Sequence, residues 1–378
     1  MQSPGEARAL HCLAAFHAWS FEGNDLWGAS KKEIHMRVGL IFACLLAMIL
    51  GVAPNAGGDP VRPPTDHETF DPGPGFEFAH SGYCKGTWRN TSKGSCTHVD
   101  HASSGELEVD DEADVYDPTY ALELLAEGGP AYCDDAPDYK TRVLYIVTQS
   151  QVTLDQDRYE ALRDVLRTKA ERSTYWIWKS AKQTGGVRHV RYVCNERDDI
   201  LIDRLILPNS ADSSFSALSS AVAAAGYNNV NRKYLAFVEW RERNATTGMR
   251  SDTACGTGEI YDNDAAGQAN PNNSGNMFGA VYLRAAYCQA WAKTAMHEFG
   301  HLLGGVQFSA PNNAAGHHVK DDWDRLGKGE TTLVCPDATQ DKRYDCNDDD
   351  YFNTSPPSGS YLDTKWNTAR NRFLVGGG

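Results

Sequence analysis

Residues 294–305 read Thr-Ala-Met-His-Glu-Phe-Gly-His-Leu-Leu-Gly-Gly, and this stretch decides how the chain is interpreted. His297 and His301 are four positions apart, so on a helix both imidazoles project from one face. Two neutral histidines at this spacing suit a tetrahedral Zn²⁺ ion, and Glu298 beside them suits a base for a metal-activated water. The residues just before the stretch lack Gly and Pro, and its double glycine predicts the end of the helix. The alternative, a buried helix with two ordinary histidines, leaves this agreement unexplained.

The first 56 residues are interpreted as an N-terminal extension followed by a secretory signal. Lys31, Lys32 and Arg37 precede an apolar run at 38–50, and small residues follow it. A basic flank, a short apolar core and small residues are typical of a signal peptide, and the run is too short to span a bilayer comfortably. We therefore expect translation to start at Met36, and a secreted, extracellular protein without stable membrane association.

Cysteine usage agrees with secretion. Removal of the leader leaves eight cysteines, an even number, which predicts four disulfides in an oxidising compartment. Sequence alone allows many connectivities, and we prefer pairs that close short loops. The expected pairs are Cys335–Cys346, Cys255–Cys288 and Cys84–Cys96, with Cys133–Cys194 by elimination. A zinc–thiolate cluster is the rival interpretation, but the chain has no C-x₂-C spacing to support it.

The charge is acidic and unevenly distributed. The formal net charge of −14 argues against nucleic acid or an anionic membrane as a partner. From residue 100 to residue 138 the chain has thirteen Asp or Glu and no Lys or Arg. We therefore interpret residues 57–136 as an acidic, low-structure region, either a pro-segment or an arm laid on the main domain. One of its cysteines could in principle cap a metal, although disulfide pairing is the default outside the cell.

Residues 137–378 have the pattern of a folded domain. Strands are predicted at 142–148, 187–194, 200–207 and 233–240, and helices at 155–182 and 213–225. This alternation predicts an α/β (α+β) fold with a mixed, mostly parallel sheet and packed helices. Gly- and Asn-rich loops are expected from 244 to 276. The segment 277–283 is expected to be an edge strand, either an ordinary one or one that binds an extended peptide.

The layout of strands and helices, followed by H-E-x-x-H-x-x-G from His297 to Gly304, resembles the metzincin group of zinc endopeptidases. The resemblance implies a zincin-like domain with an active-site helix and a substrate cleft between an upper part, 137–304, and an irregular, disulfide-bonded lower part, 305–378. In that group a third His or Asp follows three residues after the glycine, where this chain has Gln307. The group also has a methionine turn beneath the zinc, whereas Met296 is the last methionine here.

A second resemblance covers roughly residues 140–374 and is to a group of secreted actinomycete proteins regarded as zinc peptidases. It rests on stretches such as 183–191, 304–311, 345–352 and 366–369. In that group a His-Cys pair and an Asp follow Ala-Pro, and a Met-Cys pair comes next. The corresponding residues here are His318-Val319, Asp321 and Leu326-Gly327. The resemblance implies His318 as the third metal ligand, with His317, Asp321 and Asp324 as alternatives.

Together these observations predict a secreted, monomeric zinc-dependent endopeptidase that acts on a protein or peptide substrate. His297, His301 and His318 would hold Zn²⁺, and Glu298 would be the general base. One rival is an inactive secreted binding protein, supported by Gln307 and Leu326. Another is a zinc hydrolase of non-peptide amides. Ca²⁺ is a further hypothesis for two clusters of oxygen ligands, Asp262-Asn263-Asp264 and Asn347-Asp348-Asp349-Asp350.

Overall fold

A computed structural model describes residues 70–81, 83–101, 108–109, 131–314, 316–321, 324–327 and 343–376, with the backbone alone at 101, 108, 109 and 131. All of them belong to one compact unit, Pro63–Gly378. The predicted leader and the start at Met36 lie outside the described residues. Within the described part of the chain, no helix is long and apolar enough to cross a membrane.

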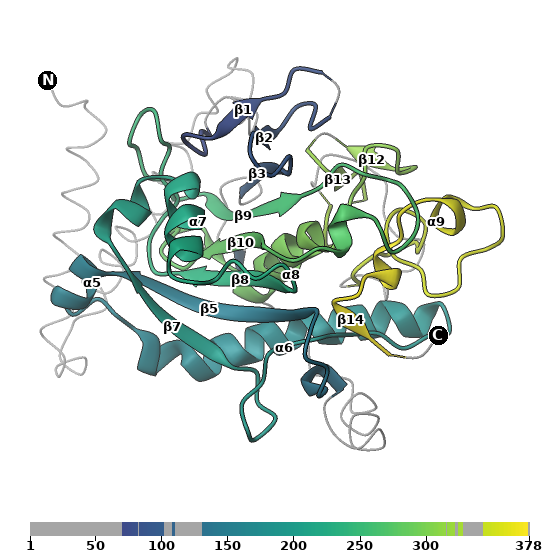
Figure 1. Ribbon diagram of the computed structural model, residues 1–378, viewed down its shortest axis with the longest axis horizontal. Helices are drawn as coiled ribbons and strands as arrows, with labels where there is room; N and C mark the ends of the chain where they lie inside the picture. The colour runs from purple at the N-terminus through teal and green to yellow at the C-terminus, as the bar shows by residue number, and fades with distance from the viewer. Residues whose placement is uncertain are drawn as a thin grey trace, which may run out of the picture. The chain divides into compact units, whose positions relative to one another are not determined.

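The centre of the unit is an eight-stranded sheet (Figure 1). Its strands, in spatial order, are β1 (Phe76–Phe78), β2 (Trp88–Asn90), β3 (Cys96–His101), β9 (Ala254–Ile260), β10 (Met277–Tyr282), β8 (Arg232–Val238), β5 (Lys140–Thr148) and β7 (Ile202–Leu207). The half from β10 to β7 is parallel, as the alternation of strands and helices predicts. The other half, from β1 to β10, is antiparallel, so the sheet is mixed rather than mostly parallel.

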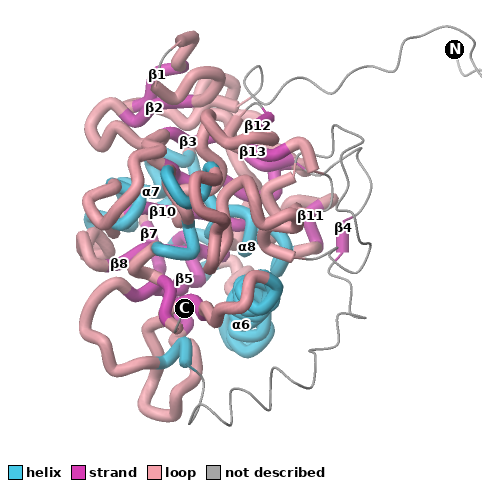
Figure 2. The backbone as a smooth tube through the Cα atoms, turned by 90° about the vertical axis from the view of Figure 1, so that its right-hand side faces the viewer, coloured by secondary structure: helices cyan, strands magenta, loops and turns pink. Residues whose placement is uncertain are grey.

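Helices cover both faces of this sheet (Figures 1 and 2). The α-helices are α5 (Gln149–Thr153), α6 (Tyr159–Gln183), α7 (Phe215–Ala224), α8 (Trp291–Leu302) and α9 (Tyr361–Thr364). In β5, Val143, Tyr145 and Val147 pack on the side of α6 and α8. The alternate residues Leu144 and Ile146 pack on the side of α7. Both faces of β5 are buried, which explains the continuous apolar sequence of this central strand.

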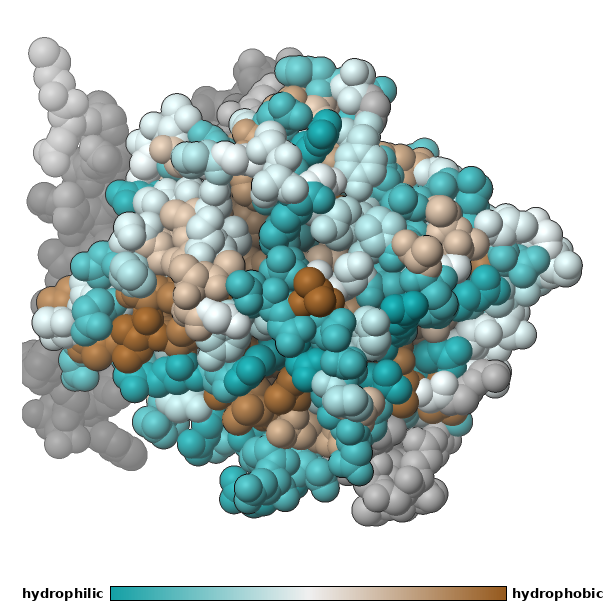
Figure 3. Space-filling view, in the orientation of Figure 1, coloured by the Kyte–Doolittle hydropathy of each residue, from teal (hydrophilic) through white to brown (hydrophobic). Residues whose placement is uncertain are grey.

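Short elements complete the described chain. Three two-stranded sheets pair β11 (Cys288–Gln289) with β4 (Glu108–Val109), β12 (Asn313–Ala314) with β13 (His318–Val319), and β14 (Leu374–Val375) with β6 (His189–Val190). The 3₁₀ turns are η2 (Ala131–Cys133), η3 (Asn209–Ser213), η4 (Pro271–Asn273) and η6 (Thr368–Arg370). After Gly304 the described chain consists of loops with elements of at most four residues. The surface seen in Figure 3 is mainly hydrophilic, with apolar residues in small groups.

Most elements predicted from periodicity are present with shifted ends, namely β5, β7, β8, α6, α7 and α8. The strand predicted at 187–194 is shorter: β6 covers two residues, and Tyr192 and Cys194 form isolated bridges. The edge strand predicted at 277–283 is wrong, because β10 lies between β8 and β9. The reason is that β9 was predicted to be loop, since its sequence Ala-Cys-Gly-Thr-Gly-Glu-Ile contains two glycines.

The segment predicted to be low in structure contributes to the sheet. Within 57–136, residues 76–101 form β1, β2 and β3, and β3 pairs with β9 along its whole length. Three predicted disulfides are present: Cys84–Cys96, Cys133–Cys194 and Cys255–Cys288. Cys346 is also disulfide-bonded, and Cys335 lies outside the described residues. All three cysteines of 57–136 are therefore in disulfides, and none of them is free to cap a metal.

Candidate metal centre

Helix α8 places His297 and His301 one turn apart on its buried face, as the spacing predicts. The Nδ1 atom of His297 lies 2.8 Å from the Arg325 carbonyl oxygen, and Nδ1 of His301 lies 2.8 Å from the Gly305 carbonyl oxygen. A carbonyl only accepts hydrogen bonds, so each Nδ1 carries the proton and each Nε2 presents a lone pair. Burial, together with the neighbouring histidines, holds the pKa of His301 well below its usual range. The His301 ring is therefore neutral.

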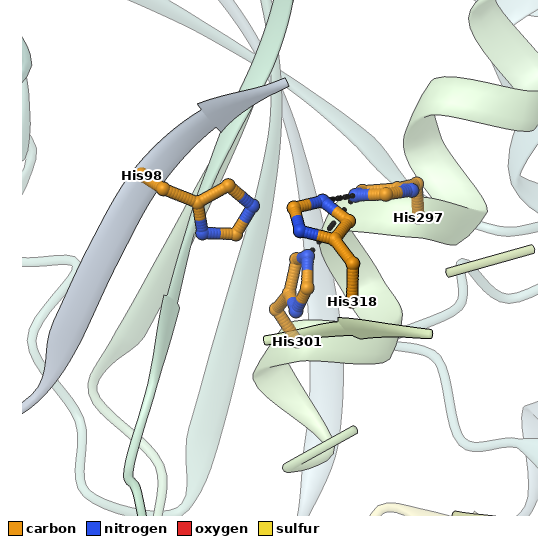
Figure 4. Close-up of side chains that lie close together, drawn as sticks. All are labelled: His98, His297, His301 and His318. Carbon is orange, nitrogen blue, oxygen red and sulfur yellow. Dashed lines mark hydrogen bonds between the residues drawn. The ribbon is translucent and has the colours of Figure 1, made fainter. Parts of the chain in front are cut away.

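Three Nε2 atoms converge in the space beside α8 (Figure 4). Nε2 of His297 lies 3.0 Å from Nε2 of His301 and 3.2 Å from Nε2 of His318. In a tetrahedral site with Zn–N bonds of about 2.0–2.1 Å, ligand nitrogens are about 3.3 Å apart. Because Nε2 of His297 and of His301 both lack a proton, no hydrogen bond explains their contact. A shared cation fits both the spacing and the lone pairs, so these residues could hold a metal ion.

His318 reaches the centre from β13. The chain turns sharply after α8 at Gly304, where φ is +93° and a Cβ would lie 2.5 Å from the indole nitrogen of Trp366. The hairpin of β12 and β13 then returns the chain, and Val319 donates a backbone hydrogen bond to the Leu326 carbonyl oxygen at 3.0 Å. Glycine is required at this turn because only glycine combines the positive φ with the close approach of Trp366.

The alternative third ligands lie elsewhere. His317 Nδ1 contacts the Val306 carbonyl oxygen at 2.7 Å, and its ring packs on Phe308. Burial lowers the pKa of His317 to about 4, which keeps this ring neutral. Asp321 accepts a hydrogen bond from Asn347 at 2.7 Å, and Asp324 belongs to a separate group of carboxylates. Of the four candidates, only His318 joins His297 and His301.

Gln307 and Leu326 are buried and contact the segments that position the histidines. Gln307 donates hydrogen bonds to the carbonyl oxygens of Gly304, at 2.8 Å, and Tyr261, at 3.1 Å. Leu326 packs beneath α8, where a Cβ on Gly300 would lie 3.0 Å from one of its methyl groups. Leu326 also follows Arg325, whose carbonyl oxygen orients His297. Gln307 therefore stabilises the turn after α8, and Leu326 supports the helix from below.

Glu298 lies between α8 and the glycines of β9. A Cβ on Gly256 would lie 2.3 Å from Glu298 Oε1, and one on Gly258 would lie 2.7 Å from Oε2. An oxygen of Glu298 is within 4.8 Å of a ring nitrogen of His297 and of an oxygen of Asp100. Burial raises the pKa of Glu298 well above its usual range, and the charge of Asp100 raises it further. The two glycines thus provide the space that the carboxylate occupies.

A fourth histidine, which the sequence did not indicate, faces the same centre. His98 of β3 joins His297, His301 and His318 in a group whose ligand atoms all lie within 4.8 Å of one another. Its ring centroid is 4.5 Å from that of His301 and 4.6 Å from that of His318. The sequence Cys-Thr-His-Val-Asp-His from Cys96 to His101 does not alternate between polar and apolar residues, so it gave little signal for a strand. Nothing local marked its partner, because β9 is more than 150 residues away in the sequence.

Three buried carboxylates form a second group. Oxygens of Asp324, Asp345 and Asp350 lie within 4.8 Å of one another. Burial and the neighbouring carboxylates raise the pKa of Asp345 well above its usual range, and they raise that of Asp350 to about 7. Only Asp350 comes from the acidic clusters singled out in the sequence. In the other cluster, Asp264 instead pairs with Lys365 at 2.8 Å and accepts a hydrogen bond from Ser309.

Comparison with known proteins does not identify a family for this chain. No protein-family model matches the chain, and no curated protein is significantly similar to it.

Proposed function

We propose that the protein is a secreted zinc-dependent endopeptidase, similar in its centre to the metzincin group. The observation that carries the proposal is the convergence of three Nε2 atoms, from His297, His301 and His318, beside the carboxylate of Glu298. Two imidazoles four residues apart on a helix, with a third from a later segment of the chain, are a donor set of a catalytic zinc site. Three disulfides support placement outside the cell.

In this proposal the three histidines bind the metal, and Glu298 transfers a proton. The Arg325 and Gly305 carbonyl oxygens fix the tautomers of His297 and His301, so their Nε2 atoms are available to the metal. Bound zinc would supply Lewis-acid polarisation of the scissile carbonyl and a lowered pKa for water. Glu298 would take a proton at one carboxylate oxygen and return it to the leaving amine. Its buried position beside Gly256 and Gly258 keeps that oxygen away from bulk water.

The sheet offers a reason to prefer a peptide substrate. Strand β9 is antiparallel to β10 and lies against Glu298, and its other edge, with which β3 pairs in this structure, is of the kind that pairs with an extended chain. A peptide paired with β9 would pass next to the carboxylate. A non-peptide amide would not use these backbone groups.

The test combines metal analysis with proteolysis of fluorescent casein. We expect about one zinc per chain, and chelator-sensitive hydrolysis. Glu298→Gln should abolish hydrolysis and retain zinc, whereas His318→Asn should lose hydrolysis and bind zinc about 10-fold more weakly or worse. His317→Asn is the matched control and should retain both, because His317 faces Val306 and Phe308 rather than the centre. A zinc affinity in His318→Asn equal to that of the parent, or unchanged hydrolysis in Glu298→Gln, would refute the proposal.

One observation favours a second candidate function. His98 provides a fourth imidazole, and a zinc site with four protein ligands is the structural kind, closed to substrate. The second candidate is therefore a secreted metal-binding protein without catalysis. It predicts one zinc per chain and no hydrolysis in any variant.

For the three buried carboxylates we propose Ca²⁺, because the donors are all hard oxygens. Asp345 is fully buried, and its Oδ1 has no hydrogen-bond partner among the described residues. Added Ca²⁺ should raise the melting temperature of the protein, and it should not do so for Asp345→Asn. An equal rise in both proteins would place any calcium elsewhere.

A further inference from the structure

We propose that His98 is a fourth ligand of the metal, and that β3 lies at the edge of β9 where a peptide substrate would pair. This inference rests on the proposed function. In this conformation the chain is a closed, latent form of the enzyme. The closing group comes from the N-terminal strands, which are covalently part of the same chain.

The surroundings of His98 indicate that its imidazole binds a metal ion. His98 is only 4 % exposed, and neither ring nitrogen has a hydrogen-bond partner among the described residues. A buried imidazole without partners loses its interactions with water and gains none in return. Its ring lies edge-on to the rings of His301 and His318, at 4.5 and 4.6 Å between centroids. A metal ion shared with those rings would satisfy the orphaned nitrogen.

Strand β3 is held firmly in this place. Its first residue, Cys96, is disulfide-bonded to Cys84, and the hydroxyl of Thr97 donates to the Gly258 carbonyl oxygen at 2.8 Å. The turn before it is anchored by Lys93, whose ammonium lies 3.1 Å from the buried Glu259 carboxylate. These contacts all involve residues just before His98, which itself pairs with Gly258. The imidazole is therefore presented to the centre by a strand that these contacts hold against β9.

The same face of β3 reaches the second functional group. Residues two apart in a strand point the same way, and Asp100 follows His98 by two. An oxygen of Asp100 lies within 4.8 Å of ligand atoms of both His297 and Glu298. Successive side chains of β3 thus approach first the three histidines and then the general base. A substrate strand paired with β9 would have to run through the same place, so β3 and substrate exclude one another.

The position of His98 explains how three ligands of the catalytic kind occur in a metal site that has no open position. A catalytic zinc site keeps one position open, whereas a structural site has four protein ligands. His297, His301 and His318 form the catalytic set, and His98 fills the remaining position. Release of β3 from β9 would free both that position and the edge of the sheet. Separation of β3 from β9 would thus convert the latent form into the active form.

The experiment compares the full-length protein with His98→Ala, His98→Phe and the control His80→Ala. His80 is an exposed histidine of the same N-terminal segment, and its ring contacts Phe78 rather than the centre. His98→Phe retains packing volume, so it separates loss of a ligand from loss of folding. The zinc X-ray absorption spectrum counts imidazoles, and the visible spectrum of Co²⁺-loaded protein with added azide reports an open position. Hydrolysis of fluorescent casein is measured in parallel.

We expect four imidazoles in the parent and in His80→Ala, and three in both His98 variants. Azide should change the Co²⁺ spectrum of His98→Ala alone. Metal should leave His98→Ala about 10-fold faster in excess chelator, as removal of one supporting group commonly changes metal affinity by 10–100-fold. Casein hydrolysis should rise about 10-fold, because loss of the bond from His98 to the metal opens the fourth position and also weakens the attachment of β3 to β9.

Three imidazoles in the parent, or an equal azide response in the parent and His98→Ala, would overturn the role of His98. Equal hydrolysis by the parent and His98→Ala, at a measurable rate, would overturn latency. The proposed function fails in a different way. Four imidazoles that become three in His98→Ala, with no hydrolysis by any variant, would establish the ligand and reject the peptidase.

Discussion

Helix α8 and strand β3 both deliver histidines to one centre, but they do so by different means. In α8, two histidines share a face because they are four residues apart, and the local backbone alone sets their spacing. In β3, His98 arrives through pairing with Gly258 of β9, and a disulfide and an ion pair hold the strand. The two histidines that helix geometry positions stay at the centre as long as α8 is folded. The histidine that strand pairing positions can leave the centre if β3 separates from β9. In the proposed latent form, α8 therefore binds the metal, and β3 controls access to it.

The largest expected effect comes from the glycines against which Glu298 packs. In Gly256→Ala, the new Cβ would lie 2.3 Å from Glu298 Oε1, so the carboxylate must move away. We expect kcat/KM for a fluorogenic peptide to fall by about 100-fold while zinc content is unchanged, because general-base catalysis is lost and the histidines remain.

The matched control is Gly279→Ala in β10, where the new Cβ would make an ordinary contact, 3.5 Å from Glu298 Cβ. Its activity should be close to that of the parent. Equal activity in Gly256→Ala and Gly279→Ala would show that the position of the carboxylate does not depend on β9.

A second prediction concerns Glu242, which follows β8 and lies near Asp71 of the N-terminal segment. Burial raises the pKa of Glu242 from 4.5 to about 8, with Arg250 opposing the shift and Asp71 adding to it. Between these pH values the unfolded chain releases this proton and the folded chain keeps it, so stability is lost as pH rises toward 8. Glu242→Gln removes that cost, and the variant should exceed the parent in free energy of unfolding by about 3 kcal/mol at pH 7.

Urea unfolding at pH 4 and at pH 7 measures the effect. At pH 4, below the unfolded-state pKa of 4.5, the Glu242 side chain is mostly neutral in both states, so the stabilities of the two proteins should nearly agree. A difference of the same size at both pH values would mean that the amide packs better, and it would contradict the pKa explanation.

The smallest expected effect is at the surface of the N-terminal strands. Glu77 of β1 and Arg89 of β2 approach to 3.6 Å, and both side chains are about half exposed. Solvent and salt weaken such a pair, so Glu77→Gln should change the free energy of unfolding by less than about 0.5 kcal/mol. The zinc content and the Co²⁺ spectrum should stay unchanged, since His98 is held by other contacts. A change in either would show that the whole hairpin, rather than β3 alone, positions His98.

The contrast between the two regions also explains how far the sequence could lead. His297, Glu298 and His301 were predictable because a helix converts short spacing into a shared face. His318 was favoured through resemblance, and the structure brings it to the other two histidines. The peptidase activity and the family stay predictions.

The antiparallel half of the sheet could not be predicted in the same way. Gly256 and Gly258 weaken the strand signal of β9, yet glycine is what the approach of Glu298 requires. Without β9, the segment 277–283 looked like an edge strand, and β3 had no visible partner. The omission of His98 therefore followed from the omission of β9.

The pairing of β3 with β9 has a consequence for synthesis. Thr97 and Gly258 are hydrogen-bonded although 161 residues separate them. At about 5–20 residues per second, a ribosome makes β9 on the order of 10 s after β3. During that interval β3 presents an unpaired edge to other nascent chains, so a holding chaperone should matter most for this segment. The strand that carries His98 is therefore made well before the strand with which it pairs.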